Sequence, residues 1–235
     1  MDNSAARRHQ RQFAASRSDF LDKVSTRKPP RQRDSEATRA RILEAAKKEF
    51  ARLGFGGARV DSIAVRAKAN KRMIYHYFNS KEELFTAVLE DAYLDIRAAE
   101  RKLALDALEP EAALETLVRF TWKYYLANPE FLTFVNSENL HKGRHLKKSK
   151  IINQEYPRFT GVVQGIVDRG VAKGVFRAGI DAVQLNITIA AINYYYLTNR
   201  YTGSVIYDRD LMAAERLNER LEFNVDTIRR LVKAG

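Results

Sequence analysis

The sequence predicts an all-α fold with a small N-terminal group of helices and a larger C-terminal group. Three observations support this prediction. Apolar residues recur at intervals of three and four along most of the chain, which is the period of amphipathic helices. Several of these segments begin at helix-starting residues and end at glycine. The sequence shows no strand-like alternation, internal repeat or low-complexity tract, and its 235 residues suffice for one or two domains with a real core.

Composition narrows the classes of function. The chain contains no cysteine, which excludes disulfide bonds, thiolate zinc sites and cysteine nucleophiles. No apolar run reaches the ~18 residues of a membrane helix, and the N-terminus carries Arg and Gln where a signal peptide needs an apolar centre. We therefore expect a soluble, cytoplasmic protein without a membrane partner.

The formal net charge of +12 is unevenly distributed. Residues 1–33 hold nine Lys or Arg against three Asp, and residues 34–80 hold ten basic residues against five acidic ones. The remaining 155 residues are almost balanced, with 22 basic and 21 acidic residues. If the protein binds a polyanion, this asymmetry places the binding surface in the first third of the chain.

Residues 1–33 are predicted to form a disordered basic arm. They contain few apolar residues and include the run Arg-Lys-Pro-Pro-Arg at 27–31. Such an arm either adds phosphate contacts or reaches a minor groove, or it is a solvated extension without an ordered role. Charge alone does not choose between these alternatives, because it gives affinity without sequence information.

The first helix is predicted over residues 36–53, with Gly54 as its stop and Gly56 and Gly57 in the following loop. Its buried stripe consists of Ile42, Leu43, Ala46, Phe50 and Leu53. We expect this helix to hold the next two at a fixed angle.

Residues 59–78 are predicted to form two short helices joined by a tight turn at 68–70. The apolar stripe of the first helix is Val60, Ile63, Ala64 and Ala67. The second helix carries Ile74, Tyr77 and Phe78 on its inward side, and Arg72, Met73, Tyr75 and His76 on or beside its outward side. This is the pattern of a helix-turn-helix, whose second helix enters the DNA major groove. A helical hairpin in an ordinary core, with charges outward, is the alternative.

The amino-acid sequence of this region resembles that of a known protein family. The order F-G-x-x-x-V-D-x-I-A, followed by A-x-A-N-K-R-x-I-Y-H-Y-F-x-S-K-E-E-L-F, resembles the N-terminal domain of the tetracycline-repressor (TetR) family of bacterial transcription regulators. The resemblance covers about Glu36 to Tyr93 and implies a DNA-binding domain over residues 36–96, followed by a helical effector-binding and dimerisation domain over residues 97–235. The residues that it implies at the DNA are Arg59, Asn70, Lys71, Arg72, Met73, Tyr75, His76, Tyr77 and Lys81.

Two positions depart from the family pattern. Lys68 occupies the turn position that is usually Gly, and a left-handed backbone there costs roughly 1 kcal/mol. Arg59 occupies a helix start that often carries Thr or Ser, so it lacks a capping hydroxyl but has a charge suited to a phosphate. Neither departure removes the fold, but both affect the DNA contacts.

A long helix is predicted over residues 81–105. Ser80 and Glu83 are expected to form a reciprocal capping box at its start. Its apolar stripe is Phe85, Leu89, Ala92, Ile96, Ala99 and Leu103. Since this helix begins beside the predicted DNA contact and runs into the second half of the chain, we expect it to be the mechanical link.

Further helices are predicted to begin at Pro110 and at Pro129, and to cover residues 151–173. The last two are predicted over residues 181–202 and 208–233. The first of this pair is apolar almost all round and needs cover on every side. We therefore expect a homodimer through the last two helices, where the TetR resemblance also implies the interface. A helix fully buried in a monomer is the alternative.

The second half is rich in aromatic residues, which are mostly core residues in folded proteins. Asn186, Asn193 and Arg200 recur at intervals of seven on an otherwise apolar helix. Their partners are a bound small molecule, a polar seam between subunits or backbone groups. The expected effector-binding residues are Trp122, Tyr125, Phe134, Tyr156, Asn186, Asn193 and Arg200.

We expect no metal site, cofactor or catalytic site. His141 and His145 have the i, i+4 spacing of a ligand pair, but basic residues surround them and no carboxylate lies close in sequence to complete a site. These basic side chains are an alternative receptor for an anionic effector. No phosphate-binding loop, serine nucleophile motif or suitably spaced carboxylate pair is present, which argues against an enzyme.

The sequence thus predicts a homodimeric transcriptional repressor that a small-molecule effector releases from a palindromic double-stranded operator at the bacterial nucleoid. The phrase G-G-A-R-V-D-S-I-A with N-K-R-M-I-Y-H-Y-F resembles a subgroup that controls catabolic pathways, which implies an aromatic or heterocyclic acid as effector. Two alternatives stay open. One is a nonspecific nucleoid-type DNA binder. The other is a dimeric ligand-binding relative that has lost specific DNA binding through Lys68 and Arg59.

Overall fold

The computed structural model describes the backbone of residues 30–235, and the side chains of residues 34–154 and 160–235. Residues 1–29 of the predicted arm lie outside the described residues, and residues 30–33 belong to the first described helix. Of the described residues, those from 30 to 41 belong to one unit and residues 42–235 to another. In the first unit Thr38 Oγ1 donates to Asp34 O at 2.8 Å, a contact between successive turns of the helix.

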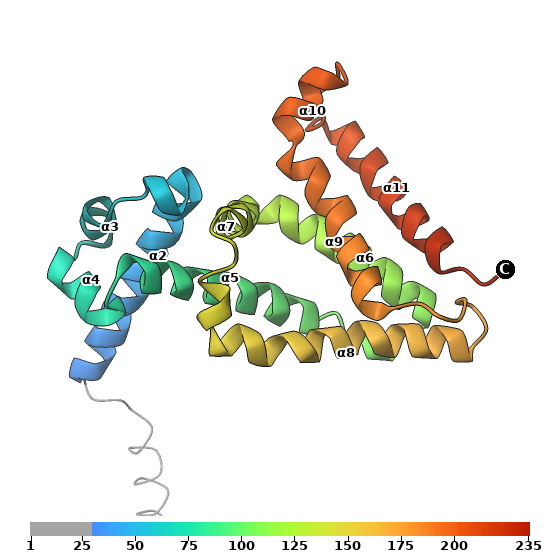
Figure 1. Ribbon diagram of the computed structural model, residues 1–235, viewed down its shortest axis with the longest axis horizontal. Coiled ribbons are helices and arrows are strands. Elements are labelled where there is room, and N and C mark those ends of the chain that lie inside the picture. Colours follow the sequence, from blue (N-terminus) through green and yellow to red (C-terminus); the bar gives the residue numbers. More distant parts are fainter. Residues whose placement is uncertain (1–29) are drawn as a thin grey trace, which may run out of the picture. The chain divides into compact units, whose positions relative to one another are not determined.

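The predicted all-α class is confirmed: the described residues contain no strand, and one isolated bridge joins Phe176 and Lys233. The α-helices are labelled in Figure 1. In chain order the elements are α2 (Pro30–Gly57), α3 (Val60–Ala67), α4 (Lys71–Phe78), α5 (Lys81–Arg101), η1 (Leu105–Ala107), α6 (Pro110–Ala127), α7 (Pro129–Leu140), η2 (Leu146–Lys148), α8 (Lys150–Ala172), α9 (Ala182–Thr198), α10 (Arg200–Ile206) and α11 (Ala214–Val232). None of the helices in the described part is both long and apolar enough to cross a membrane.

The helix expected over residues 36–53 begins earlier than predicted, at Pro30. Its regular geometry is interrupted at Gly54, which has φ 64° and ψ 178°. The positive φ explains why glycine stands at this position, since a side chain disfavours that conformation.

One apolar core is built from α2 beyond Ile42, α3, α4 and the first half of α5. At its centre the Phe85 ring lies 5.0 Å from the Phe50 ring and 5.1 Å from the Phe55 ring, between ring centroids. Phe134 of α7 is also buried in this core, at 2% exposure. The helix-turn-helix therefore shares one core with α2, with α5 and with Phe134 of α7.

A second core lies among the later helices. Here α6 packs against α8, α9 and α11, as Figure 1 shows for α6 and α9. Trp122 is buried at 2% exposure, and its ring lies 5.6 Å from that of Tyr196. This core positions the C-terminal part of α5, which supplies Ile96 to it.

Several predicted helix ends are corrected by the structure. The helix expected to reach residue 105 ends at Arg101, because Ala104 adopts the left-handed region at φ 47° before η1. The pair expected at 181–202 and 208–233 consists of three helices, α9, α10 and α11. Asn199 interrupts the first of these, where its Nδ2 donates to Tyr195 O at 3.0 Å. Asp208 has φ 49° and lies in the turn before α11.

Gly170 provides a test of packing in the second core. It is buried on α8, and a Cβ built on it would overlap the Phe176 ring. We expect Gly170→Ala to lower the free energy of unfolding by about 1–3 kcal/mol through overpacking. Gly165→Ala is the matched control, since its Cβ would meet only the end of the Arg169 side chain at 3.8 Å. It should stabilise by up to about 1 kcal/mol. Denaturant unfolding measures both, and a Gly170→Ala variant as stable as the wild type would contradict the packing.

Candidate DNA interface and effector cavity

The turn between α3 and α4 contains a left-handed residue at the position that is usually Gly in the resembling family. Lys68 is left-handed, at φ 50° and ψ 45°, and the N–H of Ala69 donates to Ala64 O at 3.0 Å. The cost of this backbone relative to Gly is about 1 kcal/mol. Asn70 then caps α4, because its Oδ1 accepts from Met73 N at 2.8 Å. The turn thus fixes where α4 begins.

The two sides of α4 differ sharply in exposure. Ile74 and Phe78 are buried at 0% and 3% exposure. Met73 and Tyr77 are half-buried against the same core. The exposed side chains are Lys71, Arg72, Tyr75 and His76. The outward surface is therefore basic and aromatic, whereas Met73 and Tyr77 help to seat the helix.

Lys71 is tied to the preceding helix. Its Nζ lies 3.1 Å from Asp61 Oδ1, and both side chains are exposed. The hydrogen bond and the charge of Asp61 raise the pKa of Lys71. Because exposed pairs contribute little to stability, Asp61 competes only weakly with a phosphate for this ammonium group.

Arg59 and Lys81 differ in their surroundings. Arg59 is exposed at the N-terminus of α3 and makes no side-chain cap. Lys81 is half-buried, with Nζ 4.7 Å from the centroid of the Phe55 ring, and burial lowers the pKa of Lys81. For Lys81 to contact a phosphate, its ammonium group must therefore move away from the Phe55 ring, or the phosphate must approach it beside that ring.

The capping box at the start of α5 forms only in one direction. Ser80 Oγ accepts from Glu83 N at 3.0 Å, as predicted. Glu83 does not return the bond to Ser80 N; its Oε2 accepts from Asn79 Nδ2 at 2.8 Å instead. The Ser80 N–H contacts Phe78 O at 2.5 Å. The helix start is thus fixed by Ser80, and Glu83 restrains the end of α4.

The end of α7 contacts the N-terminal core. Phe55 N donates to Ser137 Oγ at 3.1 Å, and the His145 ring packs against Phe55 and Phe85 at 5.0 and 5.1 Å. Glu138, at 3% exposure, accepts from His145 N at 2.8 Å, from Leu146 N at 3.0 Å, and pairs with His145 Nδ1 at 2.6 Å. The expectation that no carboxylate lies close in sequence to these histidines is therefore wrong, since Glu138 is three residues before His141. The helical turn after Glu138 brings His145 back to it.

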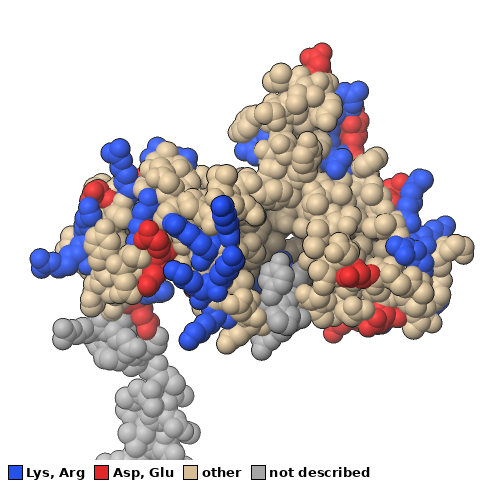
Figure 2. Space-filling view, viewed as in Figure 1, with Lys and Arg blue, Asp and Glu red and all other residues tan. Residues whose placement is uncertain are grey.

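This histidine cluster is a structural joint. Among the described residues, no group of three His, Cys, Asp or Glu is arranged to hold a metal ion. On the face drawn in Figure 2, basic side chains gather over the N-terminal helices and over the connection between α7 and α8. The exposed basic residues of that connection are Lys142, Arg144, Lys147 and Lys148, and Lys150 follows as the first residue of α8.

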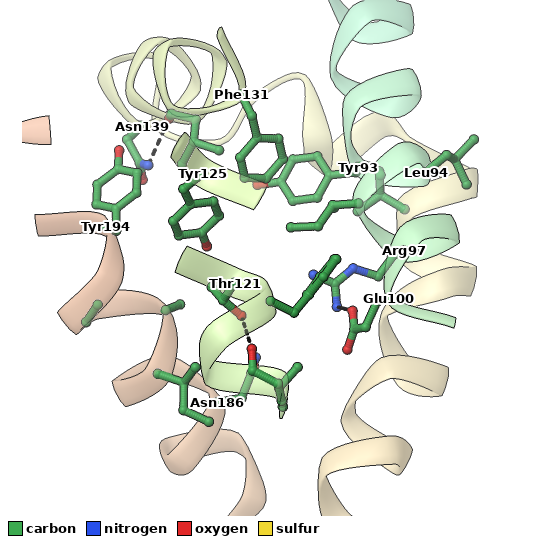
Figure 3. A pocket seen from close by; sticks show the side chains of 18 residues that line it. Tyr93, Leu94, Arg97, Glu100, Thr121, Tyr125, Phe131, Asn139, Asn186 and Tyr194 are labelled. Carbon is green, nitrogen blue, oxygen red and sulfur yellow. Dashed lines mark hydrogen bonds and ion pairs between the residues drawn. The ribbon is translucent and has the colours of Figure 1, made fainter. Parts of the chain in front are cut away.

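A cavity of about 280 Å³ lies among α5, α6, α7 and α9. Figure 3 shows aromatic side chains from several of these helices around it. The ring-bearing lining residues are Tyr93, Phe120, Tyr125, Phe131 and Tyr194. Polar groups come from Arg97, Glu100, Thr121, Asn139 and Asn186. Apolar walls with a few polar groups are typical of small-molecule sites.

Arg97 and Glu100 form an ion pair in this lining, with Arg97 Nη1 2.6 Å from Glu100 Oε2. Glu100 is only 6% exposed. Burial raises the pKa of Glu100 to about 7, although Arg97 and Arg101 act in the opposite direction. The same pair also lines a second cavity of about 540 Å³ among α5, η1 and α8. The ion pair therefore stands between the two cavities.

The residues expected to bind an effector are separated by the fold. Tyr125 and Asn186 line the 280 Å³ cavity. Trp122 and Phe134 lie instead in the two cores. Asn193 is fully buried, and its Oδ1 accepts from Asn224 Nδ2 at 2.8 Å.

The other two expected residues lie elsewhere. Arg200 Nη1 donates to Leu197 O at 2.7 Å, and the residue lines a different hollow. The side chain of Tyr156 lies outside the described residues. The hydrogen bond between Asn193 and Asn224 joins α9 to α11 within one subunit.

Sequence reasoning missed Arg97 and Glu100. The i, i+3 spacing of these two residues on α5 indicated an ion pair, but ion pairs on exposed helix surfaces have the same spacing.

Comparison with known proteins agrees with this architecture. Residues 42–88 match the model for bacterial regulatory proteins of the tetR family, and residues 110–228 match that for the tetracyclin repressor-like C-terminal domain. The chain is 42% identical to the HTH-type transcriptional repressor NicS of Pseudomonas putida, over 83% of this chain and 92% of that protein. It is 40% identical to the HTH-type transcriptional repressor SCO4008 of Streptomyces coelicolor, over 59% of this chain and 69% of the relative.

Solved structures share the fold. A putative transcriptional regulator, SCO4942 from Streptomyces coelicolor, superimposes with a TM-score of 0.62 at 25% identity, covering 83% of this chain and 98% of that one. A TetR family transcription regulator from Marinobacter aquaeolei VT8 gives 0.65 at 18% identity, covering 87% and 100%. With the matched helix-turn-helix and C-terminal helices, these findings establish that the chain belongs to the TetR family of transcriptional regulators.

Proposed function

We propose that this protein is a homodimeric repressor that binds a partly palindromic operator and is released from it by a small-molecule effector. The observation that carries this proposal is the exposed side of α4, where Arg72, Tyr75 and His76 project from a helix anchored by Ile74 and Phe78. A regulator of this kind acts on chromosomal DNA, at the nucleoid in the bacterial cytoplasm.

Arg72 and Lys71 are the proposed contacts to base edges or phosphates, since guanidinium and ammonium groups donate to guanine and to phosphate oxygens. Tyr75, His76 and Lys81 would fix the register on the phosphate backbone. Arg59 adds a charge at the start of α3. Met73 and Tyr77 are half-buried, so they contribute less to the DNA surface than the sequence pattern implied.

The proposed dimer forms through α9 and α11. Residues at i+4 spacing give α9 an exposed stripe of Val183, Ile187, Ala191 and Tyr195. Ile187 is 53% and Tyr195 62% exposed, and no residue of α9 is charged. On α11, Phe223 is 62% exposed. A contiguous apolar surface of this kind favours an interface, and a two-fold dimer would present two α4 helices to major grooves about 34 Å apart.

Release is proposed to start at the 280 Å³ cavity. α5 lines this cavity at Tyr93 and Arg97, and it begins at Lys81 beside α4. α7 lines it at Phe131, and its later residue Ser137 contacts Phe55 of the N-terminal core. An effector that shifts either helix would change the position of α4. To weaken operator binding a hundredfold, it must prefer the non-binding state by about 2.7 kcal/mol.

The proposed effector is a small aromatic or heterocyclic acid. Aromatic walls suit a flat ring, and Arg97 supplies a positive charge in the lining. NicS and SCO4008 are named as repressors, which supports the sign of regulation proposed for this chain.

Selection of bound sites from random duplexes tests the operator proposal. We expect a palindromic site, and we expect Arg72→Ala to weaken binding to it by about tenfold to a hundredfold, since a bidentate base contact contributes about 1–3 kcal/mol. Lys123→Ala, an exposed charge removal on α6, is the matched control and should bind as the wild type does. Fluorescence anisotropy at fixed salt measures both variants. Recovery of no preferred sequence would favour a nonspecific nucleoid-type binder instead.

A further inference from the structure

Positive charge in the second half of the chain is concentrated in one segment. Residues 139–158 hold six Lys or Arg against one acidic residue, Glu155. The rest of residues 81–235 holds 16 basic and 20 acidic residues. A surface that is charged only for solubility has both signs interspersed, so this segment is a candidate for binding a polyanion.

The connection between α7 and α8 presents the cations of this segment to solvent. We call Lys142, Arg144, Lys147 and Lys148 the basic connection, and all four side chains are exposed. Figure 2 shows basic side chains gathered here. Within the described part of the chain, no carboxylate pairs with any of the three lysines. Arg144 Nε donates to His145 Nε2 at 3.4 Å, and its guanidinium has no ion pair among the same residues. These charges are therefore available to a binding partner.

Two buried anchors fix the basic connection to the core that contains α3 and α4. The His145 ring, in the middle of the connection, packs against Phe55 and Phe85 of that core. Ser149 directly follows the connection at 1% exposure, and its Oγ donates to Glu90 Oε1 of α5 at 2.7 Å. The four cations are therefore held on the same core as the helix-turn-helix, although they follow it in the second half of the chain.

The basic connection adjoins the proposed phosphate contact at the start of α5. Lys81 Nζ lies 4.7 Å from the centroid of the Phe55 ring, and Arg144 Cζ lies 5.5 Å from the same centroid. The two charged groups are therefore no further apart than the sum of these distances. Because duplex DNA carries one phosphate charge per roughly 1.7 Å of its axis, cations this close can contact phosphates only a few base pairs apart.

We propose that the basic connection is a second DNA-binding surface, which contacts the phosphate backbone of the operator beside the phosphate that Lys81 contacts. This rests on the operator binding proposed above. The ammonium groups and the Arg144 guanidinium bind phosphate oxygens without reaching base edges. The surface therefore adds affinity and leaves the preferred sequence to α4.

An anionic effector is the alternative partner for these cations. Small molecules bind in clefts that bury most of their surface, whereas all four side chains of the basic connection are exposed. A duplex is an extended polyanion and meets cations on an open surface. The exposure of the whole group thus favours DNA.

Salt-dependent operator binding by the full-length protein tests this proposal. The test variant combines Lys142→Gln, Lys147→Gln and Lys148→Gln, which removes three charges and leaves Arg144 packed on Phe55. Fluorescence anisotropy over a range of salt concentrations gives Kd and its salt dependence. Each phosphate contact that is lost should lower the slope of log Kd against log salt by about 0.9, so two lost contacts in each subunit of a dimer lower it by about 3.6. Operator affinity at physiological salt should fall by at least about tenfold.

The matched control combines Lys102→Gln, Lys123→Gln and Lys233→Gln. These lysines are also exposed, and they lie after α5, on α6 and after α11. The control removes the same net charge, and it should keep the salt slope and the affinity of the wild type. Circular dichroism and light scattering check the fold and the subunit state of both triple variants.

Two further readouts locate the contact. Selection of bound sites by the test variant should recover the same palindrome as the wild type, because phosphates carry no sequence information. Phosphate ethylation should interfere with wild-type binding at positions where it no longer affects the test variant. These positions should adjoin those at which Lys81→Gln becomes insensitive to ethylation.

The proposal is overturned if the test variant has the salt slope and affinity of the control, if both triple variants lose affinity equally, or if the preferred sequence changes. If citrate then raises the melting temperature of the wild type but not of the test variant, the cations bind a small anion instead. A wild type that selects an operator while the two triple variants behave alike leaves the repressor intact and removes only the second surface. If no operator is recovered, the proposed function fails, and the salt slopes on an arbitrary duplex still decide whether the basic connection binds phosphates.

Discussion

Replacing Ile187 by Asp is expected to convert the proposed dimer into a monomer and to weaken operator binding by at least about a hundredfold. Ile187 is 53% exposed at the centre of the α9 stripe, on a helix that carries no charge of its own. A carboxylate there would lose its water when two copies meet, and the partner's stripe would offer no counter-ion on α9. Since each subunit contributes one α4, a monomer reads only half of a palindrome.

Light scattering after size exclusion measures the subunit state, and anisotropy measures operator affinity. Leu140→Asp is the matched control, because Leu140 is also an exposed apolar residue, at 83%, but lies at the end of α7. It should leave the dimer intact. An Ile187→Asp variant that stays dimeric would show that α9 is not the interface.

Glu138→Ala is expected to lower the free energy of unfolding by about 3–5 kcal/mol, the range found when one partner of a buried pair is removed. Glu138 accepts from two backbone N–H groups, those of His145 and Leu146, and pairs with the His145 ring. Alanine would leave all three groups without this acceptor in a buried setting. Denaturant unfolding monitored by circular dichroism measures the loss.

Two further variants make this test specific. Glu138→Gln keeps an oxygen for the backbone N–H groups and should lose less stability than alanine. Glu130→Ala removes a half-exposed carboxylate from the first turn of the same helix and should change stability by no more than about 0.5 kcal/mol. Equal effects of Glu138→Ala and Glu130→Ala would contradict the importance of the joint between α7 and the N-terminal core.

The helix-turn-helix was predictable because its information is local. Ile74 and Phe78 are four residues apart, so the helical period alone places them on one side and Arg72 and His76 on the other. The left-handed backbone at Lys68 was considered only because the resembling family usually has Gly at this position, and the structure has it at φ 50°. The half-buried state of Tyr77 was less predictable, since it depends on how closely α4 approaches the core.

The cavity proposed for the effector was far less predictable. A spacing of seven placed Asn186 and Asn193 on one line of α9, yet one lines the cavity and the other bonds Asn224, which is 31 residues further along the chain. Trp122 and Tyr125 are neighbours on α6 and both are buried in the second core, yet only Tyr125 of the two lines the cavity. The difference is set by which helix lies opposite each turn.

The amino-acid sequence by itself determined the helical class, the helix-turn-helix motif and the concentration of positive charge in the first third of the chain. Periodicity and turn chemistry act over a few residues and need no partner. The tertiary structure decided that Arg97 and Glu100 share a cavity, that Ser137 contacts Phe55 and that α9 ends at Thr198. These depend on packing between helices far apart in the chain, where burial places a common i, i+3 ion pair in the wall of a cavity.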